Sequence, residues 1–315
     1  MRGISLSLGL AASSLVLLLA DAPAHAQATR TWVSGVGDDA NPCSRTAPCK
    51  TFAGAISKTF INGEISCLDP GGFGAVTITK SITIDCHEIL ASILASGTNG
   101  IIINIAANAN DPLRTVRLRN ISINGTGASG AVGTRTGING IRIDQALNVF
   151  VEDMLITGFS QRGILDQRSV AGKLYIKNST IRDNAGPGIA VAPSAIVEAK
   201  IVNVHSELNS FGIAVGANGR VMVSNSTFTG NSAVGVEADP NGSLTVSHSV
   251  MSSNGLGVQA GGGSFVRLSN NDITFNGTAI GGATLSFGNN RIAGNTAAGT
   301  APTPVGADSH DKGQQ

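Results

Sequence analysis

A repeated unit of roughly two dozen residues runs from Val116 to Asn295 and limits the possible fold more than any other feature. In each copy, alternating apolar residues lead to a turn residue, and from the third copy on a second Asn follows six positions later. The first turn position holds Asn120, Asp153, Asn178, Asn203, Asn225, His248, Asn270 and Asn289. The second holds Asn184, Asn209, Asn231, Asn254, Asn276 and Asn295. A unit this short cannot bury an apolar face alone, so successive copies must stack on one another.

The apolar residues of each unit lie two and four positions before the first turn residue. Alternate residues of a strand share one face, so these side chains are predicted to point into a common interior. The predicted inward residues are Val116, Leu118, Val149, Val151, Leu174, Ile176, Ala199, Ile201, Val221, Val223, Leu244, Val246, Val266, Leu268, Leu285 and Phe287. A spacing of two rather than about 3.6 argues against an α-solenoid and predicts an all-β, single-stranded parallel β-helix with three short strands per coil.

The recurring Asn fits such a coil. Asn tolerates the left-handed backbone conformation that a sharp corner needs. Stacked Asn amides can also hydrogen-bond from one layer to the next.

The segment before the repeat carries a family resemblance. It reads Thr31-Trp-Val-Ser-Gly-Val-Gly-Asp-Asp-Ala-Asn-Pro and continues through Ala47-Pro-Cys-Lys-Thr-Phe to Ala55-Ile56. It resembles the opening of secreted right-handed β-helix proteins of the pectin-lyase-like superfamily, although Cys49 and Lys50 interrupt the usual pattern between the Pro and the Thr-Phe pair. With the coils, the resemblance covers roughly residues 31–295. It implies right-handed coiling and a short helix that closes the N-terminal end.

Thr51 is independently predicted as the N-cap of an apolar helix containing Phe52, Ala55 and Ile56. The expected organisation is a signal peptide over 1–26, an N-terminal cap with a disulfide loop over 27–60, the right-handed β-helix over 61–295 and a disordered tail over 296–315.

Residues 1–26 have the features of a secretory signal peptide. Arg2 precedes a mainly apolar stretch, and Ala24-His25-Ala26 offers a cleavage site before Gln27. An uncleaved membrane anchor is the alternative, but the apolar stretch is short and interrupted by Ser and Gly. We therefore expect a periplasmic or secreted protein without stable membrane insertion.

All four cysteines lie within the first 86 residues, as suits an oxidising compartment. Of the three possible pairings we favour Cys43–Cys49 and Cys67–Cys86. The second pair is separated by close to one coil, which would place one cysteine above the other. A metal-binding or catalytic thiol is disfavoured because no Cys-x-x-Cys or Cys/His spacing occurs.

Charge and aromatic content argue against a nucleic-acid partner. The 21 Lys and Arg residues nearly cancel the 20 Asp and Glu residues, so no global basic field exists. Aromatic residues make up only 4% of the chain, too few for a long base-stacking groove.

Outward residues of successive coils are expected to form columns, and two of these gather basic and aromatic side chains. An acidic sugar chain would need such a face, since a ring can stack on a pyranose while Arg or Lys pairs with its carboxylate. The candidate ligand-binding residues are Arg117, Arg119, Phe150, Tyr175, Lys177 and Lys200. The alternative is a solvated face on which Arg119, Glu152 and Lys177 form cross-strand ion pairs.

A catalytic site is the second hypothesis, with weaker support. Its candidate residues are Arg142, Asp144, Asp166, Arg168 and Glu237. Glu237 and Asp239 are two apart, as a glycosidase pair could be, but Asp239-Pro-Asn-Gly is also a strong turn signal. Superfamily lyases use clustered acidic calcium ligands with an Arg or Lys base, and superfamily hydrolases use several Asp and a His in short motifs. Neither pattern is present, so no catalytic residue is assigned.

No cofactor or metal is expected. Asp38, Asp39 and Asn41 could supply calcium ligands, but turn capping explains them as well. Three functions remain open: a non-catalytic module that binds polysaccharide or cell-surface material, a polysaccharide lyase or hydrolase with an unfamiliar site, and a structural or adhesive rod. The link between this chain and carbohydrate rests only on analogy with other proteins of the same fold. The lack of clustered carboxylates favours the first and third.

Overall fold

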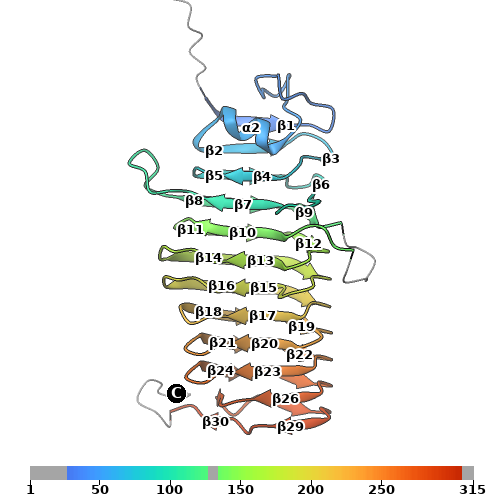
Figure 1. The fold of residues 1–315 in the computed structure, drawn as a ribbon, viewed down its shortest axis with the longest axis vertical. Helices are drawn as coiled ribbons and strands as arrows, with labels where there is room; N and C mark the ends of the chain where they lie inside the picture. Colours follow the sequence, from blue (N-terminus) through green and yellow to red (C-terminus); the bar gives the residue numbers. More distant parts are fainter. Residues whose placement is uncertain (1–26, 127–133, 307–315) are drawn as a thin grey trace, which may run out of the picture.

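The computed structural model describes residues 27–126 and 134–306, which form a stack of parallel β-coils. One side of the stack is a ten-stranded parallel sheet whose strands lie one below another in Figure 1. Its strands are β4 (Val76–Ile78), β7 (Ile101–Asn104), β10 (Asn139–Gln145), β13 (Arg162–Asp166), β15 (Ile189–Val191), β17 (Phe211–Val215), β20 (Val234–Ala238), β23 (Leu256–Ala260), β26 (Thr278–Gly281) and β29 (Ala297–Gly299).

The other sides form one 20-stranded sheet made of two series of strands that meet at the corner of each coil. The first series is β1 (Ala28–Val33), β2 (Thr59–Cys67), β5 (Ile82–Asp85), β8 (Thr115–Arg119), β11 (Asn148–Glu152), β18 (Gly219–Ser224), β21 (Ser243–Ser247), β24 (Phe265–Ser269), β27 (Leu285–Ser286) and β30 (Thr303–Pro304). The second series is β3 (Gly71–Gly72), β6 (Ala91–Leu94), β9 (Ile121–Asn124), β12 (Leu155–Thr157), β19 (Thr227–Thr229), β22 (Val250–Ser252), β25 (Asp272–Thr274) and β28 (Arg291–Ala293). Both β14 (Gly172–Arg182) and β16 (Val197–Glu207) run through the corner and belong to both series.

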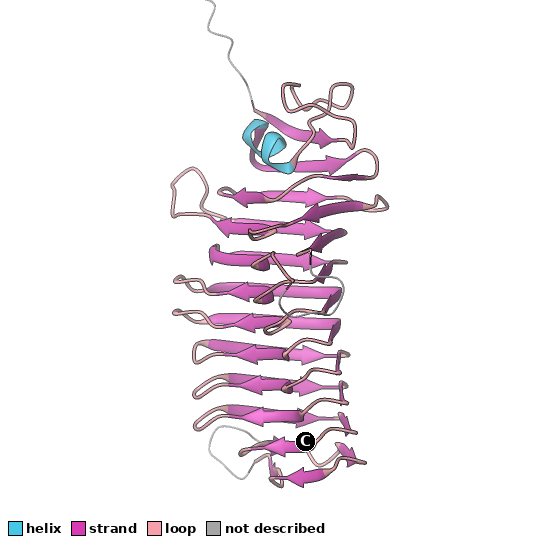
Figure 2. Cartoon of the chain, turned by 45° about the vertical axis from the view of Figure 1, so that its right-hand side comes forward, coloured by secondary structure: helices cyan, strands magenta, loops and turns pink. Residues whose placement is uncertain are grey.

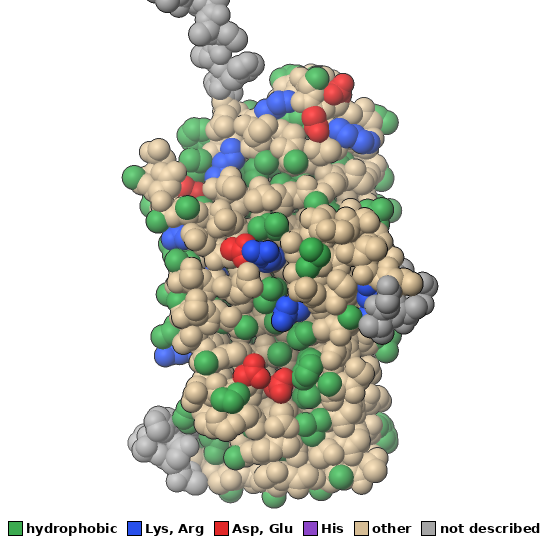
Figure 3. All heavy atoms as spheres, viewed as in Figure 1, with side chains coloured by type: hydrophobic (Ala, Val, Ile, Leu, Met, Phe, Trp, Pro, Cys, Tyr) green, Lys and Arg blue, Asp and Glu red, His purple; other side chains and the backbone are tan. Residues whose placement is uncertain are grey.

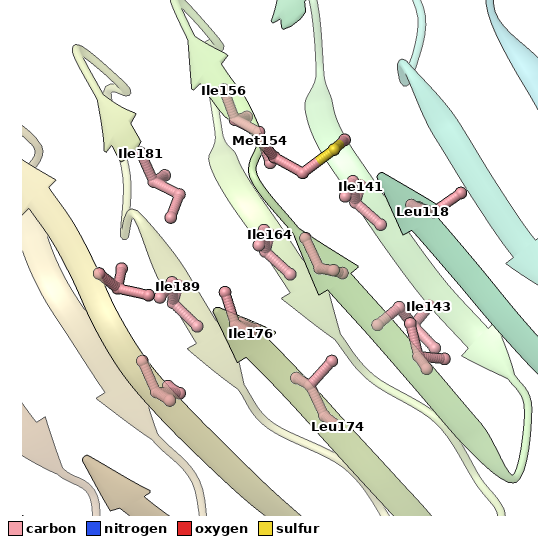
Figure 4. Packing of buried hydrophobic residues seen from close by; sticks show 14 of the residues in the cluster. Leu118, Ile141, Ile143, Met154, Ile156, Ile164, Leu174, Ile176, Ile181 and Ile189 are labelled. Carbon is pink, nitrogen blue, oxygen red and sulfur yellow. The ribbon is translucent and has the colours of Figure 1, made fainter. Parts of the chain in front are cut away.

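The interior of the coils is the apolar core that the sequence predicted. The predicted inward side chains are buried, except Leu285 and Phe287 near the last coil, which are half-buried. Side chains of one kind repeat from coil to coil, as Ile141, Ile164 and Ile189 do in Figure 4. Because burying each Val, Leu or Ile side chain contributes about 1.5–3 kcal/mol, the repeated apolar positions drive the stacking.

The first turn residues form the sharp corners for which Asn was predicted. Asn120, Asn178, Asn203, Asn225 and Asn270 all have positive φ between 50° and 54°. His248, which replaces Asn in one coil, takes the same conformation, with φ 50°. The amide of Asn203 donates to the side-chain oxygen of Asn178 at 3.0 Å, so these corners also bond between layers.

The second Asn positions form a ladder inside the molecule. Asn184, Asn209, Asn231, Asn254 and Asn276 are nearly fully buried. Asn231 donates to Asn254 at 2.9 Å, and Asn254 donates in turn to Asn276 at 3.0 Å. These bonds satisfy amides and backbone groups that would otherwise be buried without partners.

Among the described residues there is one short helix, α2 (Phe52–Lys58), at the N-terminal end of the stack, where Figure 2 shows it in cyan. Thr51 is its N-cap as predicted, since the Thr51 side chain accepts a hydrogen bond from the backbone N–H of Gly54. Phe52 and Ala55 are buried, and the Phe52 ring lies 5.1 Å from that of Phe73.

Both predicted disulfides are present. Cys43 pairs with Cys49, and Cys67 pairs with Cys86, with Cα atoms 4.6 and 4.8 Å apart respectively. The second bridge closes a 19-residue loop between β2 and the turn after β5. It therefore ties two successive coils at the N-terminal end.

Removal of the second bridge should weaken this end of the molecule. We expect Cys67→Ser/Cys86→Ser to lower the free energy of unfolding by roughly 3 kcal/mol, because the open loop gains entropy in the unfolded chain. Urea unfolding under oxidising conditions measures the change. The same measurement on the wild type with reductant is the control, and an unchanged midpoint for the double variant would contradict the expectation.

The C-terminal boundary differs from the prediction of a disordered tail from residue 296. Strands β29 and β30 continue the coils, and the backbone N–H groups of Ala297 and Thr303 donate to Gly277 and Thr284 of the preceding coil. A segment rich in Ala, Thr, Pro and Gly can still pair because the coil before it offers free carbonyls. The β-helix thus reaches Pro304, and residues 307–315 and the predicted signal peptide lie outside the described residues.

Candidate functional site

The predicted column of outward residues exists in register on the first strand series. Arg117, Phe150, Tyr175, Lys200, Met222, Thr245 and Arg267 face one another on strands β8, β11, β14, β16, β18, β21 and β24. We call the outward side of these seven strands the basic face. Residues far apart in sequence meet here because each coil lies directly over the last.

The two aromatic rings of this column stack on each other. The centroids of Phe150 and Tyr175 are 4.7 Å apart with an angle of 6° between the ring planes. The guanidinium of Arg117 lies over the other side of the Phe150 ring, 4.0 Å from its centroid. Both faces of Phe150 are therefore covered, so in this arrangement the ring has no free face on which a sugar could stack. Only Tyr175 keeps a ring face toward the next coil, where Lys200 lies.

The neighbouring column is partly neutralised within the protein. Arg119 forms ion pairs with Glu152 at 2.8 Å and with Asp85 at 3.3 Å. These are the cross-strand pairs of the structural alternative, although Asp85 rather than Lys177 supplies the third charge. Lys177 is exposed in register with Glu152. Arg119 is thus a poor partner for a ligand carboxylate, whereas Lys177 remains accessible.

A further outward column lies beside Tyr175 and Lys200 and was missed in the sequence. Its residues Thr115, Asn148, Lys173, Glu198, Arg220, Ser243 and Phe265 are in register on the same seven strands. The signal was available, since these residues lie two positions before the predicted column and a strand repeats its face every second residue.

Two shallow hollows join on the basic face. One of about 410 Å³ is lined by Lys173, Tyr175, Glu198, Ala199, Lys200, Arg220, Val221, Met222, Ser243 and Thr245. The other, of about 290 Å³, is also lined by Arg220 and Ser243 and extends to Phe265. Together they form one groove, which we call the β14–β24 groove. The first hollow brings three cations and one carboxylate beside an aromatic ring.

Catalytic residues that act on a polymer must face outward, but two of the candidates lie inside the protein, which contradicts their proposed role. Asp166 and Arg168 are both 0% exposed. Asp166 is in register with Ile143 and Val191, so its side chain faces inward. It accepts two hydrogen bonds from the Arg168 guanidinium, at 2.8 and 2.6 Å. A polymer in solution cannot reach this pair.

The remaining candidates are not brought together. Arg142 and Asp144 form a partly exposed ion pair at 2.9 Å on β10, whereas Glu237 lies on β20. Burial, followed by the charge of Asp239, raises the pKa of the Glu237 carboxyl. Asp239 begins the predicted turn, where its carbonyl accepts from Gly242 at 2.9 Å. Figure 3 shows that charged side chains on this side of the molecule form only a few small, separate groups.

The candidate calcium ligands in the N-terminal loop already have partners. The Asp39 carboxylate accepts hydrogen bonds from the backbone of Lys50 and from the backbone and hydroxyl of Thr51. Asp38 accepts from the backbone of Ala40, as expected for turn capping. Within the described residues, no three His, Cys, Asp or Glu side chains gather in a way that could hold a metal ion.

Comparisons with known proteins identify the fold. Residues 211–309 match the family model described as the right handed beta helix region. The protein is a right-handed parallel β-helix, as the resemblance implied. No curated protein matches the chain.

Solved structures share this fold at low sequence identity. A complex of XylC with xylose is 10% identical, with a TM-score of 0.58 over 82% of this chain and 68% of that chain. The A-module of the mannuronan C-5 epimerase AlgE6 from Azotobacter vinelandii is 15% identical, with a TM-score of 0.51 over 78% of this chain and 80% of that chain. In the described part of the chain, no helix is long and apolar enough to cross a membrane.

Proposed function

We propose that the protein is an exported, non-catalytic β-helix that binds an anionic polysaccharide or cell-surface glycan in the β14–β24 groove. The observation that carries this proposal is the hollow in which Tyr175 stands beside Lys173, Lys200 and Arg220. Lys and Arg form charge-assisted hydrogen bonds with carboxylates or sulfates. Tyr175 lines the same hollow, where its ring can offer a sugar an apolar contact.

The surroundings of these cations support a role in binding. Lys173, Lys200 and Arg220 are exposed, and no ion pair joins any of them to an acid within residues 27–126 and 134–306. Exposed charge pairs contribute only about 0.2–1 kcal/mol each, so the affinity would come from several contacts and would fall with added salt.

Export is part of the same proposal. The N-terminal 26 residues carry the sequence features of a cleavable signal, and the two disulfides suit the periplasm or the outside of the cell. We also propose that α2 closes the N-terminal end of the core, because Phe52 and Ala55 are buried against the first coils. Two neighbours in fold are named for carbohydrate, as a complex with xylose and as an epimerase of mannuronan.

A lyase or hydrolase function has less support. Of its candidate residues, two are buried in an ion pair and two others are paired with each other on the surface. Release of unsaturated uronate or new reducing ends from pectate or alginate, with or without Ca²⁺, would favour the enzyme. Asp144→Ala and Glu237→Ala would then show which carboxylate takes part.

Binding can be tested with two substitutions in the hollow. We expect Tyr175→Ala and Lys200→Ala each to weaken binding to an acidic glycan by about tenfold, since each removes one central contact. A glycan array followed by calorimetry on the best ligand measures the change. Arg45→Ala is the matched control, because Arg45 is exposed in the disulfide loop far from the groove in sequence and fold. A wild type that binds no acidic glycan, or variants that bind as the wild type does, would refute the proposal.

A further inference from the structure

The charge of the two outward columns that line the groove alternates from coil to coil. Within the two columns that line the groove, each coil supplies one pair of side chains. The pairs, in order from β8 to β24, are Thr115 with Arg117, Asn148 with Phe150, Lys173 with Tyr175, Glu198 with Lys200, Arg220 with Met222, Ser243 with Thr245, and Phe265 with Arg267. The first coil is positive, the next neutral, and this pattern continues without a break to β24.

Glu198 produces the neutral coil in the middle of the groove. It is exposed on β16 next to Lys200, in register with Lys173 on one side and Arg220 on the other. Without Glu198, three successive coils would each carry a cation. The carboxylate therefore separates the positive coils β14 and β18 by a coil without net charge.

The spacing of the coils along the axis matches the spacing of sugars in an extended chain. Neighbouring coils are about 4.8 Å apart, so positive coils recur about every 9.6 Å along the axis. One pyranose unit of an extended chain advances by about one coil. A chain lying along the axis would thus place one sugar on each coil and every second sugar beside a cation.

We propose that the β14–β24 groove selects a linear polysaccharide that carries an anionic group on every second sugar. This inference rests on the proposed function and names its ligand class. A polymer charged on every sugar would bring a carboxylate next to Glu198, and like charges in proximity repel. An alternating polymer places an uncharged sugar there, whose hydroxyl groups can donate to Glu198.

Two polymers of equal length test the proposal. Hyaluronan has a carboxylate on alternate sugars, whereas polygalacturonate has one on each sugar. Although polygalacturonate carries twice the charge, we expect the wild-type protein to bind hyaluronan about fivefold more tightly at constant ionic strength. Glu198→Gln/Thr245→Lys makes the neutral coils of the groove positive and should reverse the preference.

Glu207→Gln is the matched control, since Glu207 lies on the same strand β16 but in its second-series part, in register with Thr229. It should keep the wild-type preference. If neither polymer binds, both the proposed function and this inference fail. Equal or tighter binding of polygalacturonate by the wild type, or an unchanged ratio in the double variant, would refute the alternation while leaving the proposed function in place.

Discussion

Asp166→Ala is expected to lower the free energy of unfolding by about 3–5 kcal/mol, because it leaves a charged guanidinium buried without a counter-ion. The Arg168 side chain is 0% exposed and has Asp166 as its ion-pair partner. Its other contacts are the carbonyl oxygens of Ala146, Leu147 and Lys173, at 3.1–3.4 Å. These neutral acceptors can hold the guanidinium in place but cannot balance its charge. Urea unfolding followed by circular dichroism measures the loss.

Two further variants separate the buried charge from other causes. Asp166→Leu/Arg168→Leu removes both charges and should cost less than Asp166→Ala alone, although the three carbonyls lose their donor. Asp144→Ala breaks the exposed pair with Arg142 and should cost less than about 1 kcal/mol. If Asp166→Ala is no more harmful than Asp144→Ala, the buried pair does not stabilise the fold as inferred.

Sequence predicted the coils well because their signal repeats. Apolar residues two positions apart, such as Val149 and Val151, must lie on the same face of a strand. The Asn residues at the corners indicate where each strand ends. Columns such as Phe150 beside Tyr175 followed from this register without further assumptions. The last coil was not predicted, because its strands form by pairing with the free edge of the preceding coil. The amino-acid composition of this segment gives no sign of that edge.

The candidate site was predicted less completely. Asp166 shares its strand face with the buried Ile164, so register alone would have placed it inside. Charged side chains are rarely buried without a partner, however, and only the structure shows that Arg168 pairs with Asp166 inside the protein. The stacking of Arg117, Phe150 and Tyr175 depends on side-chain rotamers, which sequence spacing does not determine.

Asn254→Ala should also destabilise the protein by about 3–5 kcal/mol, because it removes the centre of the buried Asn ladder. The Asn254 side chain accepts from the backbone and the amide of Asn231, both at 2.9 Å. It donates to the Phe228 carbonyl and to the Asn276 side chain, both at 3.0 Å. The substitution therefore leaves two N–H groups of Asn231 and the Phe228 carbonyl without this partner, whereas the Asn276 side-chain oxygen keeps the backbone N–H of residue 254. Asn254 is only 3% exposed, so water cannot replace the lost bonds.

Asn218→Ala provides the comparison for this variant, since Asn218 is half-buried and its amide makes one hydrogen bond, to the Pro193 carbonyl at 3.2 Å. It should cost no more than about 1 kcal/mol. Native-state hydrogen exchange adds a local test: in Asn254→Ala the backbone amide of Asn231 loses its acceptor and should exchange faster than the amides of β14, several coils away. If the two Asn variants unfold at the same urea concentration, the buried Asn ladder adds no more to the stability of the stack than one half-buried hydrogen bond does, and the inference is wrong.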